Sequence, residues 1–256
     1  MGPSDFPSNG NVLAVVVTYQ PDQDLERNLR AVKSQTALVV VVDNGSTNIV
    51  NVASVAESVG CRLIRNQANL GVATAFNQGI AVARDEGFAW VITFDQDSLA
   101  PPGLITGLLD LYRNHPRRNE IGIIAPTHRD RGTGDSYYQR GDRLDENEGW
   151  RIVRSCISSG CLVPTAVYVR IGGLDESLFI DFVDHDFCMR CRGKGLLVLE
   201  STRHVLVHSI GAAVARRVLG KRLIFTNHLP VRHYYMTRNQ LEVYRRSLRV
   251  NFIWAA

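Results

Sequence analysis

Asp95 and Asp97 are the carboxylates whose spacing best suits chemistry, because they are separated by one residue and follow an apolar segment. In extended backbone, side chains at positions i and i+2 point to the same side, so both carboxylates can face one cation. Carboxylate oxygens together with diphosphate oxygens are common ligands of Mg²⁺ and Mn²⁺. An isolated Asp-x-Asp can also be an acidic turn. Its position at the end of an expected strand favours a metal site.

A second group of carboxylates, Asp181, Asp184 and Asp186, lies at the start of an expected helix. Asp184 or Asp186 could act as a general base that removes the proton of an attacking hydroxyl. Either could instead be a favourable charge near the positive end of the helix dipole. Further along, His208 ends an expected strand. A single histidine is often only packed, but beside a carboxylate site it is a candidate metal ligand.

The elements that must position these residues begin with an alternation of strands and helices over the first hundred residues. Short apolar runs indicate buried strands, and apolar residues at helical spacing separate them. This order predicts a parallel sheet with helices on both faces, and such sheets bind ligands beyond the carboxyl ends of their strands. The strands are expected at Val12–Thr18, Leu38–Val42, Arg62–Arg65 and Ala89–Phe94.

The second half of the chain has a less regular pattern. The polar segment Thr127–Arg151 shows no clear period, and we expect a long functional or mobile loop there. Val153–Pro164 is expected to be a strand pair. The remaining expected elements are helices at Leu104–Tyr112, Phe182–Arg192 and Val231–Val250 and strands at Ile121–Ala125 and Leu196–His208.

Bulk composition narrows the class of protein. The chain has 256 residues, of which 45% are hydrophobic and 21% charged, which is typical of a globular domain with a sizeable core. No run approaches the roughly 20 apolar residues that span a bilayer, and the polar start lacks a signal-peptide pattern, so we expect a cytoplasmic protein. Five cysteines, an odd number, suit reduced thiols better than a disulfide framework, and their spacings match no common zinc module.

Charge is distributed unevenly along the chain. From Ser201 to Ala256 there are ten Lys or Arg residues and a single acid, Glu242. A basic end of this kind favours an anionic partner such as a diphosphate, a membrane surface or nucleic acid, although it can also be a solvated helix face. No Gly-x-Gly-x-x-Gly follows the first strand and no Gly-x4-Gly-Lys-Ser/Thr occurs, which disfavours dinucleotide dehydrogenases and P-loop enzymes.

Several motifs occur in an order that resembles the inverting family 2 glycosyltransferases with the GT-A fold. Two of them, Phe94-Asp-Gln-Asp-Ser98 and Tyr234-Tyr-Met-Thr-Arg-Asn239, are similar to the bacterial rhamnosyltransferase branch, which uses dTDP-L-rhamnose. The ordered set runs from about Val12 to Gly211. It consists of Val17-Thr-Tyr19, Val42-Asp-Asn-Gly-Ser46, Asn69-Leu-Gly-Val-Ala-Thr-Ala-Phe-Asn-Gln-Gly79, Phe94-Asp-Gln-Asp97, Gly172-Gly-Leu-Asp175, Val183-Asp-His-Asp186 and His208-Ser-Ile-Gly211.

The resemblance implies a role for each matching residue. The donor side would be built by nucleotide-binding residues, with Asp95 reaching the ribose or the metal and Asp97 binding the metal. His208 would lie near the metal and the phosphates. Asp184 would be the general base. Many relatives carry Glu-Asp where this chain has Val183-Asp184, and this departure leaves Asp186 as the alternative base. The nucleotide-binding residues would be Thr18, Tyr19, Asp43, Asn69, Gly71, Asn77 and Asp95.

The basic end of the chain would form an acceptor or phosphate region. Arginines can hold a lipid-linked pyrophosphate bidentately or rest on anionic headgroups, and tyrosines can stack on sugar or pack in the core. The residues concerned are Arg232, Tyr234, Arg238 and Asn239. Relatives tend to continue beyond the position where this chain stops, so a membrane-associating tail is expected to follow.

Taken with the resemblance, the sequence predicts an α/β protein with the GT-A fold, a mainly parallel sheet and a C-terminal helical acceptor region. It would transfer L-rhamnose from dTDP-L-rhamnose to a lipid-linked glycan or a cell-surface polysaccharide such as the O-antigen of lipopolysaccharide, with Mg²⁺ or Mn²⁺ and with inversion. The alternatives are a UDP- or GDP-linked sugar donor, a nucleotidyltransferase, and a non-catalytic basic module. Nucleic acid is not expected, since it would leave the acidic motifs without a purpose.

The expected domain organisation is one domain in two sub-regions. Residues 1–11 would be a flexible leader. Residues 12–211 would form the catalytic domain, divided into a nucleotide-binding half at 12–100 and an acceptor and catalytic half at 101–211. Residues 212–256 would be a basic helical region of the same domain, able to contact the cytoplasmic face of an anionic inner membrane peripherally.

Overall fold

The computed structural model describes residues 8–130, 134, 143–208, 214–218, 221–225 and 229–250. Within these residues the strands are β1 (Val12–Thr18), β2 (Leu38–Asp43), β3 (Arg62–Arg65), β4 (Trp90–Asp95), β5 (Ile121–Asp130), β6 (Arg143–Asn147), β7 (Trp150–Val153), β8 (Leu162–Pro164) and β9 (Leu197–His208). The helices are α1 (Leu25–Lys33), α2 (Ile49–Val59), α3 (Val72–Asp85), α4 (Leu104–Asn114), α5 (Thr165–Ile171), α6 (Val183–Gly193) and α7 (Pro230–Val250).

One sheet runs through the described part of the molecule in the order β3-β2-β1-β4-β8-β5-β9-β7-β6. The strands β3, β2, β1 and β4 are parallel, as the alternating pattern predicts. Beyond β4 the sheet is mixed, because β8 is antiparallel to both β4 and β5 while β5 and β9 are parallel. The expected mainly parallel sheet therefore describes the first half of the chain, and the second half is mixed.

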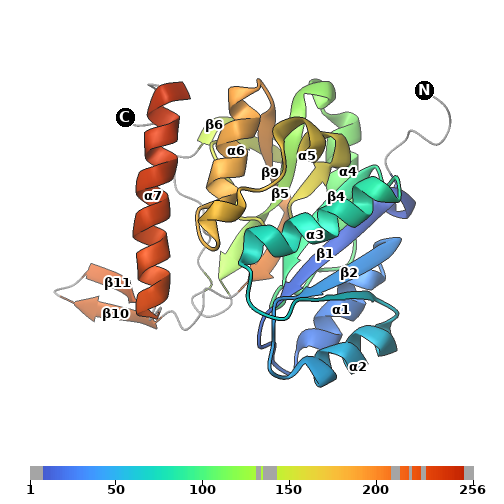
Figure 1. Cartoon of the computed structure of the whole chain (residues 1–256). Coiled ribbons are helices and arrows are strands. Elements are labelled where there is room, and N and C mark those ends of the chain that lie inside the picture. Colours follow the sequence, from blue (N-terminus) through green and yellow to red (C-terminus); the bar gives the residue numbers. More distant parts are fainter. Residues whose placement is uncertain are drawn as a thin grey trace.

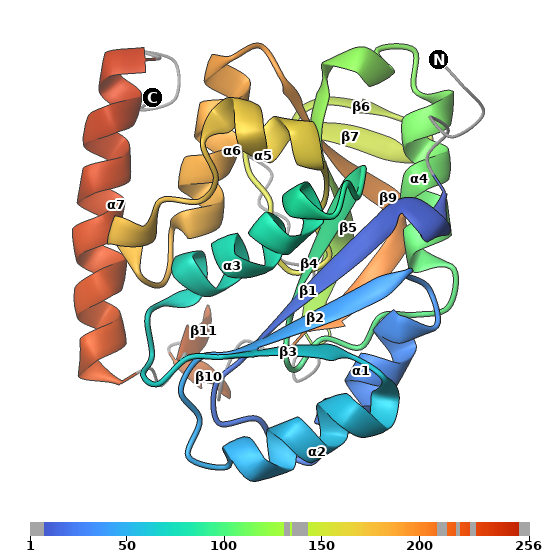
Figure 2. The same ribbon diagram turned by 45° about the vertical axis from the view of Figure 1, so that its right-hand side comes forward.

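Helices cover both faces of this sheet (Figures 1 and 2). Apolar residues of α1, α2 and α4 form one buried cluster with one side of the strands, and residues of α3, α5 and α6 form a second cluster with the other side. Every residue of β1 is buried, which explains its continuous apolar run. The two clusters hold the strands rigidly, so the loops at their carboxyl ends have a fixed base.

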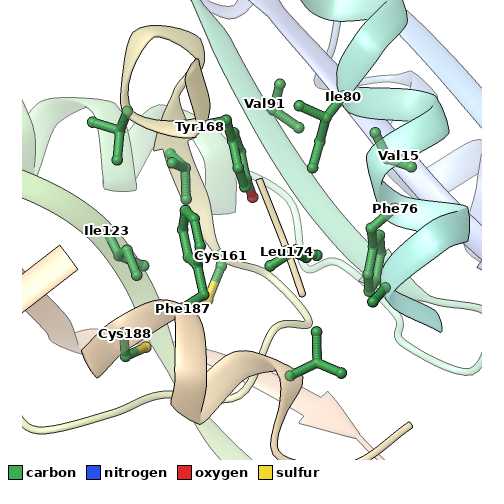
Figure 3. Close-up of a cluster of buried hydrophobic side chains, with 14 of the residues drawn as sticks. Val15, Phe76, Ile80, Val91, Ile123, Cys161, Tyr168, Leu174, Phe187 and Cys188 are labelled. Atoms are coloured by element: carbon green, nitrogen blue, oxygen red, sulfur yellow. The ribbon is translucent and has the colours of Figure 1, made fainter. Parts of the chain in front are cut away.

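The contact between α3 and β1 is unusually close. A Cβ atom on Gly79 would lie 2.4 Å from a methyl carbon of Val15, so only glycine allows this approach. Phe76 and Ile80 flank Gly79 on the buried side of α3 and face the same cluster (Figure 3). Across that cluster, the rings of Tyr168 and Phe187 stack with their centroids 4.9 Å apart and so join α5 to α6.

Two expectations for the middle of the chain are wrong. Part of the expected loop Thr127–Arg151 is strand, since β5 continues to Asp130 and β6 pairs with β7 as a hairpin at the sheet edge. All β6 residues from Leu144 to Asn147 are exposed. Because neither face of this strand is buried, its sequence lacks the alternation of apolar and polar residues that marks a strand. The expected strand pair Val153–Pro164 contains only the end of β7 and the three residues of β8. Residues 154–161 between them are irregular.

The C-terminal region, expected to be helical, also contains a two-stranded antiparallel sheet made of β10 (Val214–Val218) and β11 (Lys221–Phe225). The helix α7 follows and lies beside α6 (Figure 1). Its residue Val243 is fully buried in the cluster that also contains Phe187 of α6. No helix in the described part of the chain combines the length and the apolar character needed to cross a membrane.

Only the end of the expected leader falls within the described residues. Asn9–Asn11 forms a short 3₁₀ turn immediately before β1. The Nδ2 atom of Asn9 donates a hydrogen bond of 3.1 Å to Oγ1 of Thr106 in α4. The part of the leader that the structure describes is therefore anchored on the helix layer.

Candidate active site

A pocket of about 570 Å³ opens at the carboxyl ends of β1, β2 and β4. Its opposite wall comes from the loop before β8, the turn that precedes α6, and the first turn of α7. Apolar side chains line part of it, and five charged residues converge on it. These are Asp95, Asp97, Asp181, Asp184 and Arg232.

Asp95 and Asp97 both face this pocket, on either side of Gln96. Asp95 is the last residue of β4, and its carbonyl oxygen accepts a hydrogen bond of 3.1 Å from the N–H of Ser98, which closes a turn. The Gln96 side chain binds the backbone of Tyr19 instead, accepting from its N–H at 2.7 Å and donating to its carbonyl at 3.1 Å. The turn is thereby fixed to the loop that follows β1.

Two neighbouring carboxylates are a donor set that fits Mg²⁺ or Mn²⁺, which commonly takes one or two protein carboxylates and completes its shell with phosphate oxygens and water. Among the residues whose side chains are described, no three His, Cys, Asp or Glu side chains form a metal-binding group. The third expected ligand, His208, has a side chain outside the described residues. Its backbone ends β9, and the preceding Val207 forms a bridge with Leu99. The end of β9 thus lies beside the turn Asp95–Ser98, called the aspartate turn below.

Ser159 supports the aspartate turn and was not singled out from the sequence. Its buried hydroxyl accepts a hydrogen bond of 3.2 Å from the N–H of Asp95 and lies 2.7 Å from the hydroxyl of Ser98. The carbonyl of Ser159 lies 2.6 Å from Nε2 of His128 in β5. The Ser-Ser-Gly sequence at 158–160 is the only local signal of this irregular loop, because it is typical of a turn.

Asp184 lies at the start of α6 and lines the pocket. Its Oδ1 atom accepts hydrogen bonds of 2.9 Å from the N–H of His185 and from Nδ1 of the same ring. Burial raises the pKa of Asp184, but the charge and hydrogen bonds of His185 and a backbone hydrogen bond from Ser158 outweigh burial, so the pKa is below its usual value. Asp184 is therefore a carboxylate at neutral pH, able to accept a proton.

Asp186, the alternative base, lies outside the pocket. Its side chain is fully buried and pairs with two arginines, Nε of Arg190 at 2.7 Å and Nη1 of Arg246 at 3.4 Å. A buried carboxylate held between two cations has no access to a substrate hydroxyl. The two acids therefore have different surroundings, and of the two only Asp184 lines the pocket.

The turn before α6 has a strained backbone. Phe179, Asp181 and Phe182 have φ values of 64°, 61° and 63°, in the left-handed region that non-glycine residues rarely adopt. Each such residue costs about 1–3 kcal/mol unless the surrounding structure holds it. Phe179 and Asp181 line the pocket, and the Asp181 carboxylate pairs with Arg232 at 3.0 Å. Strain of this kind is commonly found at functional sites.

Four of the residues expected at the nucleotide line the pocket, namely Tyr19, Asn69, Gly71 and Asp95. Asn44, which was not among the expected residues, organises the loop of Asn69 and Gly71. Its Nδ2 atom donates to Oδ1 of Asn69 at 2.8 Å, and its Oδ1 atom accepts from the N–H of Leu70 at 3.0 Å. The Asp43-Asn44-Gly-Ser turn signal in the sequence points to this position without indicating which side chain faces the pocket.

The other expected nucleotide residues lie behind the pocket wall. Thr18 and Asp43 are fully buried, and the Thr18 hydroxyl donates to Oδ2 of Asp43 at 2.9 Å. Ser46 donates its backbone N–H to Oδ1 of Asp43 at 2.9 Å. Asn77 bonds the backbone of Leu174, donating to its carbonyl and accepting from its N–H, both at 2.9 Å. These three side chains are used in holding the loops and do not contribute to the pocket surface.

The residues expected in the acceptor region are similarly divided. Arg232 lines the pocket, whereas the ring of Tyr234 is 60% exposed and lies outside its lining. Asn239 is fully buried and donates to backbone carbonyls, and Arg238 donates to the carbonyls of Ser177 and Leu178. Arg238 and Asn239 therefore use their side-chain donors to bind backbone carbonyls of the segment that precedes α6.

Comparisons with known proteins give consistent matches to this arrangement. The family model described as glycosyl transferase family 2 matches residues 13–164. The chain is 33% identical to the dTDP-rhamnosyl transferase RfbF of Shigella flexneri, over 93% of this chain and 81% of that protein. It is 32% identical to an N-acetylglucosaminyl-diphospho-decaprenol L-rhamnosyltransferase of Mycobacterium tuberculosis (strain ATCC 25618 / H37Rv), over 77% of this chain and 76% of that protein.

Solved structures with the same fold have much lower sequence identity. S. aureus TarS 1–349 in complex with UDP-GlcNAc superposes with a TM-score of 0.67 at 14% identity, covering 94% of this chain and 67% of that chain. GalNAc-T7 with UDP, GalNAc and Mn²⁺ superposes with a TM-score of 0.61 at 11% identity, covering 82% of this chain and 44% of that chain. At these identities the likeness concerns the fold alone.

Proposed function

This chain belongs to glycosyl transferase family 2, and from that membership we propose that it transfers L-rhamnose from dTDP-L-rhamnose to a hydroxyl of a glycan. The observation that carries the choice of sugar is the 33% identity to a dTDP-rhamnosyl transferase over 93% of this chain. The pocket supports it, since a strand-end carboxylate pair and a separate ionised carboxylate are the groups such a transfer requires.

On the donor side, Asp95 and Asp97 would hold a divalent cation against the diphosphate. When bound, Mg²⁺ or Mn²⁺ neutralises the negative charge that develops on the departing dTDP. Tyr19 and Asn69 border the same end of the pocket and would contact the nucleoside. Arg232, at the opposite wall, carries a positive charge that suits a phosphate group or an anionic acceptor.

On the acceptor side, Asp184 would take the proton of the attacking hydroxyl as that oxygen bonds to the anomeric carbon. The bond from this carbon to the diphosphate breaks in the same displacement, and dTDP leaves on the opposite face. A single displacement inverts the anomeric centre, so no covalent intermediate on the protein is needed. The lowered pKa of Asp184 supports this role, because the group is already deprotonated at neutral pH.

The acceptor would be a lipid-linked glycan or a growing cell-surface polysaccharide such as O-antigen. Residues 12–211 would form the catalytic unit, and residues 212–256 would belong to the same unit, which the burial of Val243 against α6 supports. The exposed side chains Tyr234, Leu241 and Arg245 on α7 suit peripheral contact with an anionic membrane at its cytoplasmic face. Co-sedimentation with anionic vesicles that weakens with added salt would test this contact.

The function is tested by calorimetric titration with dTDP, UDP and GDP, each with and without Mn²⁺, followed by a transfer assay with the matching nucleotide sugar. We expect dTDP to bind most tightly, and only with the metal. Preference for UDP or GDP would favour the alternative that the donor carries another sugar. Absence of binding to all three nucleotides under both conditions would contradict the transferase function and favour a non-catalytic role.

A further inference from the structure

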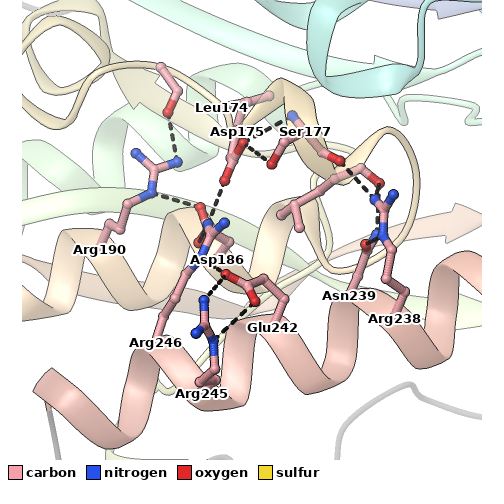
Figure 4. Close-up of polar contacts among 12 residues, drawn as sticks. Leu174, Asp175, Ser177, Asp186, Arg190, Arg238, Asn239, Glu242, Arg245 and Arg246 are labelled. Atoms are coloured by element: carbon pink, nitrogen blue, oxygen red, sulfur yellow. Dashed lines mark hydrogen bonds and ion pairs between the residues drawn. The ribbon is translucent and has the colours of Figure 1, made fainter.

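The turn from Leu178 to Asp181 is held by a buried amide on α7. Asn239 has no exposed surface, and its Nδ2 atom lies 2.7 Å from the carbonyl oxygen of Leu178, 2.7 Å from that of Ile180 and 2.9 Å from that of Asp181. Figure 4 shows Asn239 and Arg238 directed from α7 toward this segment. One side-chain nitrogen therefore lies within hydrogen-bond distance of three carbonyl oxygens. They belong to a segment in which Phe179 and Asp181 have positive φ.

Neighbouring residues on the same face of α7 contact the same turn. Arg238 donates to the carbonyl of Leu178 at 3.2 Å and to that of Ser177, immediately before the turn, at 2.7 Å. The ring of Tyr235 stacks on Phe179 with the centroids 4.8 Å apart. Arg232 pairs with the Asp181 carboxylate at 3.0 Å. Positions 232, 235 and 239 are spaced i, i+3 and i+7, so they form one stripe along the helix.

The opposite side of the turn rests on the start of α3. The N–H of Val72 donates to the carbonyl of Phe179 at 2.7 Å. A Cβ atom on Gly71 would lie 2.7 Å from that same oxygen, so the two backbones are in direct contact. The turn is thus held between the start of α3, which directly follows the pocket residues Asn69 and Gly71, and α7. Asp184 follows it within three residues at the start of α6.

We propose that Asn239 is a positioning residue: by holding the turn Leu178–Asp181 in its strained form, it sets the pocket wall and the place of Asp184 relative to the bound donor. This inference rests on the proposed function of Asp184 as the base. It assigns the Arg238-Asn239 pair a task different from contact with the acceptor. A group that acts through backbone geometry affects the chemical step, because displacement of a reacting group by about 1 Å can cost roughly 100-fold in rate.

The test compares Asn239→Leu with Gln240→Leu, the same substitution at the next residue of α7, whose side chain is exposed. For Asn239→Leu we expect kcat to fall roughly 100-fold while the affinity for dTDP with Mn²⁺ stays as in the unsubstituted protein. Gln240→Leu should leave both quantities unchanged. A value of kcat for Asn239→Leu equal to that of Gln240→Leu would overturn the proposal.

Amide hydrogen exchange gives a readout independent of activity. Exchange across residues 178–184 should accelerate in Asn239→Leu and not in Gln240→Leu, with the strands of the sheet unaffected. Unchanged exchange in this segment would overturn the proposal even if the unsubstituted protein transferred none of the nucleotide sugars tried, an outcome that would separately remove the proposed function.

Arg238→Met provides a milder variant if Asn239→Leu does not fold. It removes the donors to the carbonyls of Ser177 and Leu178 from a side chain that is only partly buried. We expect kcat of the folded Arg238→Met variant to fall by a smaller factor than the fall expected for Asn239→Leu, with the affinity for dTDP unchanged. Full retention of kcat by Arg238→Met would count against the proposal in that case.

Discussion

Asp184 and Asp186 occupy the first turn of the same helix, yet they have opposite surroundings. Asp184 opens on the pocket and is hydrogen-bonded by His185, whereas Asp186 is enclosed by the guanidinium groups of Arg190 and Arg246. Side chains two positions apart on a helix point about 200° from one another, so one faces the cavity and the other the interior. Under the proposed function, the same residue type would serve proton transfer at one position and fold stability at the other.

We expect Asp184→Asn to lower kcat by about 10²- to 10⁴-fold, the usual loss on removing a general base, with unchanged dTDP affinity. Asp186→Asn should instead destabilise the fold, by about 3–5 kcal/mol, because it leaves two arginines beside a neutral buried group. Steady-state kinetics and denaturant unfolding of both variants separate the two effects. A greater loss of kcat in folded Asp186→Asn than in Asp184→Asn would reverse the assignment.

The pH dependence of kcat should report the environment of Asp184. The pKa of Asp184 lies below the ordinary value of 3.8, so this carboxylate is deprotonated at neutral pH. Its protonation should therefore lower kcat only at pH values below 3.8. In His185→Ala the imidazole charge and its side-chain hydrogen bond are removed while the backbone N–H of residue 185 remains, so the pKa of Asp184 should rise and the acid limb of kcat should move to higher pH. A limb that stays in place or moves to lower pH would show that His185 does not control this carboxylate.

Asp97 should govern the metal dependence of donor binding. In Asp97→Ala the cation would lose one of the two carboxylates at the end of β4, and metal affinity should fall by more than about tenfold, the smallest loss seen for removal of an outer-shell partner. Titration of dTDP with and without Mn²⁺ measures the effect. If Mn²⁺ strengthened dTDP binding to the variant and to the unsubstituted protein equally, the metal site would lie elsewhere.

The contact between the start of α3 and the turn before α6 is a feature of whole elements, and Gly71 makes it possible. Gly71 has φ of +89°, and an added Cβ atom would meet backbone atoms of Phe179 at 2.7–2.8 Å. Gly60, at the end of α2, has φ of +73° but no atom within 4 Å of an added Cβ. Gly60 has the left-handed helical conformation, whereas Gly71, with ψ of 157°, lies in a region that is essentially restricted to glycine, so alanine at Gly71 adds both a greater backbone strain and a steric clash.

We therefore expect Gly71→Ala to be more destabilising than Gly60→Ala, which should cost about 1 kcal/mol or somewhat more for backbone strain alone. The additional loss should be about 1–3 kcal/mol, comparable to overpacking of an interior contact. Urea denaturation of the two variants measures this difference. Equal urea midpoints for the two variants would mean that the turn before α6 moves away from the added methyl group at no cost in stability.

At the scale of the whole molecule, the second half of the chain extends the sheet begun by the first half and supplies the opposite wall of the pocket. Thr93 of β4 accepts a hydrogen bond of 2.6 Å from the N–H of Gly160, and α6 and α7 complete the opposite wall of the pocket. Three thiols meet where these parts join. Sγ of Cys156 lies 3.4 Å from Sγ of Cys161 and 3.7 Å from Sγ of Cys188.

The thiols of this cluster and the buried Cys191 of α6 should report global unfolding. A hydrogen bond with Cys161 and burial raise the pKa of Cys156, and burial raises the pKa of Cys191, so both remain protonated and unreactive near neutral pH. We expect slow alkylation by iodoacetamide in the folded protein and rapid alkylation in denaturant. Mass spectrometry of each cysteine checks this. Fast labelling of Cys191 under native conditions would show local opening of α6.

The sequence by itself determined the elements of the first half and the carboxylates that end them. Continuous apolar runs identify β1, β2 and β4, because a strand covered on both faces has apolar residues on both sides. The alternation of side chains likewise predicts that Asp95 and Asp97 face one site, and both line the pocket; Gln96 between them lines it too, with its side chain hydrogen-bonded to Tyr19. These features depend on residues adjacent in the chain, so local patterns are sufficient to reveal them.

Only the tertiary structure decided which of the candidate polar residues face the pocket. Asn239 contacts the carbonyl of Leu178, 61 positions away along the chain, and Asn77 contacts Leu174 at a separation of 97 positions. Asp43 is enclosed by Thr18 from the neighbouring strand. A polar side chain in a sequence can serve a ligand or a backbone carbonyl equally well. Its partner is determined by the packing of distant elements, which no local spacing encodes.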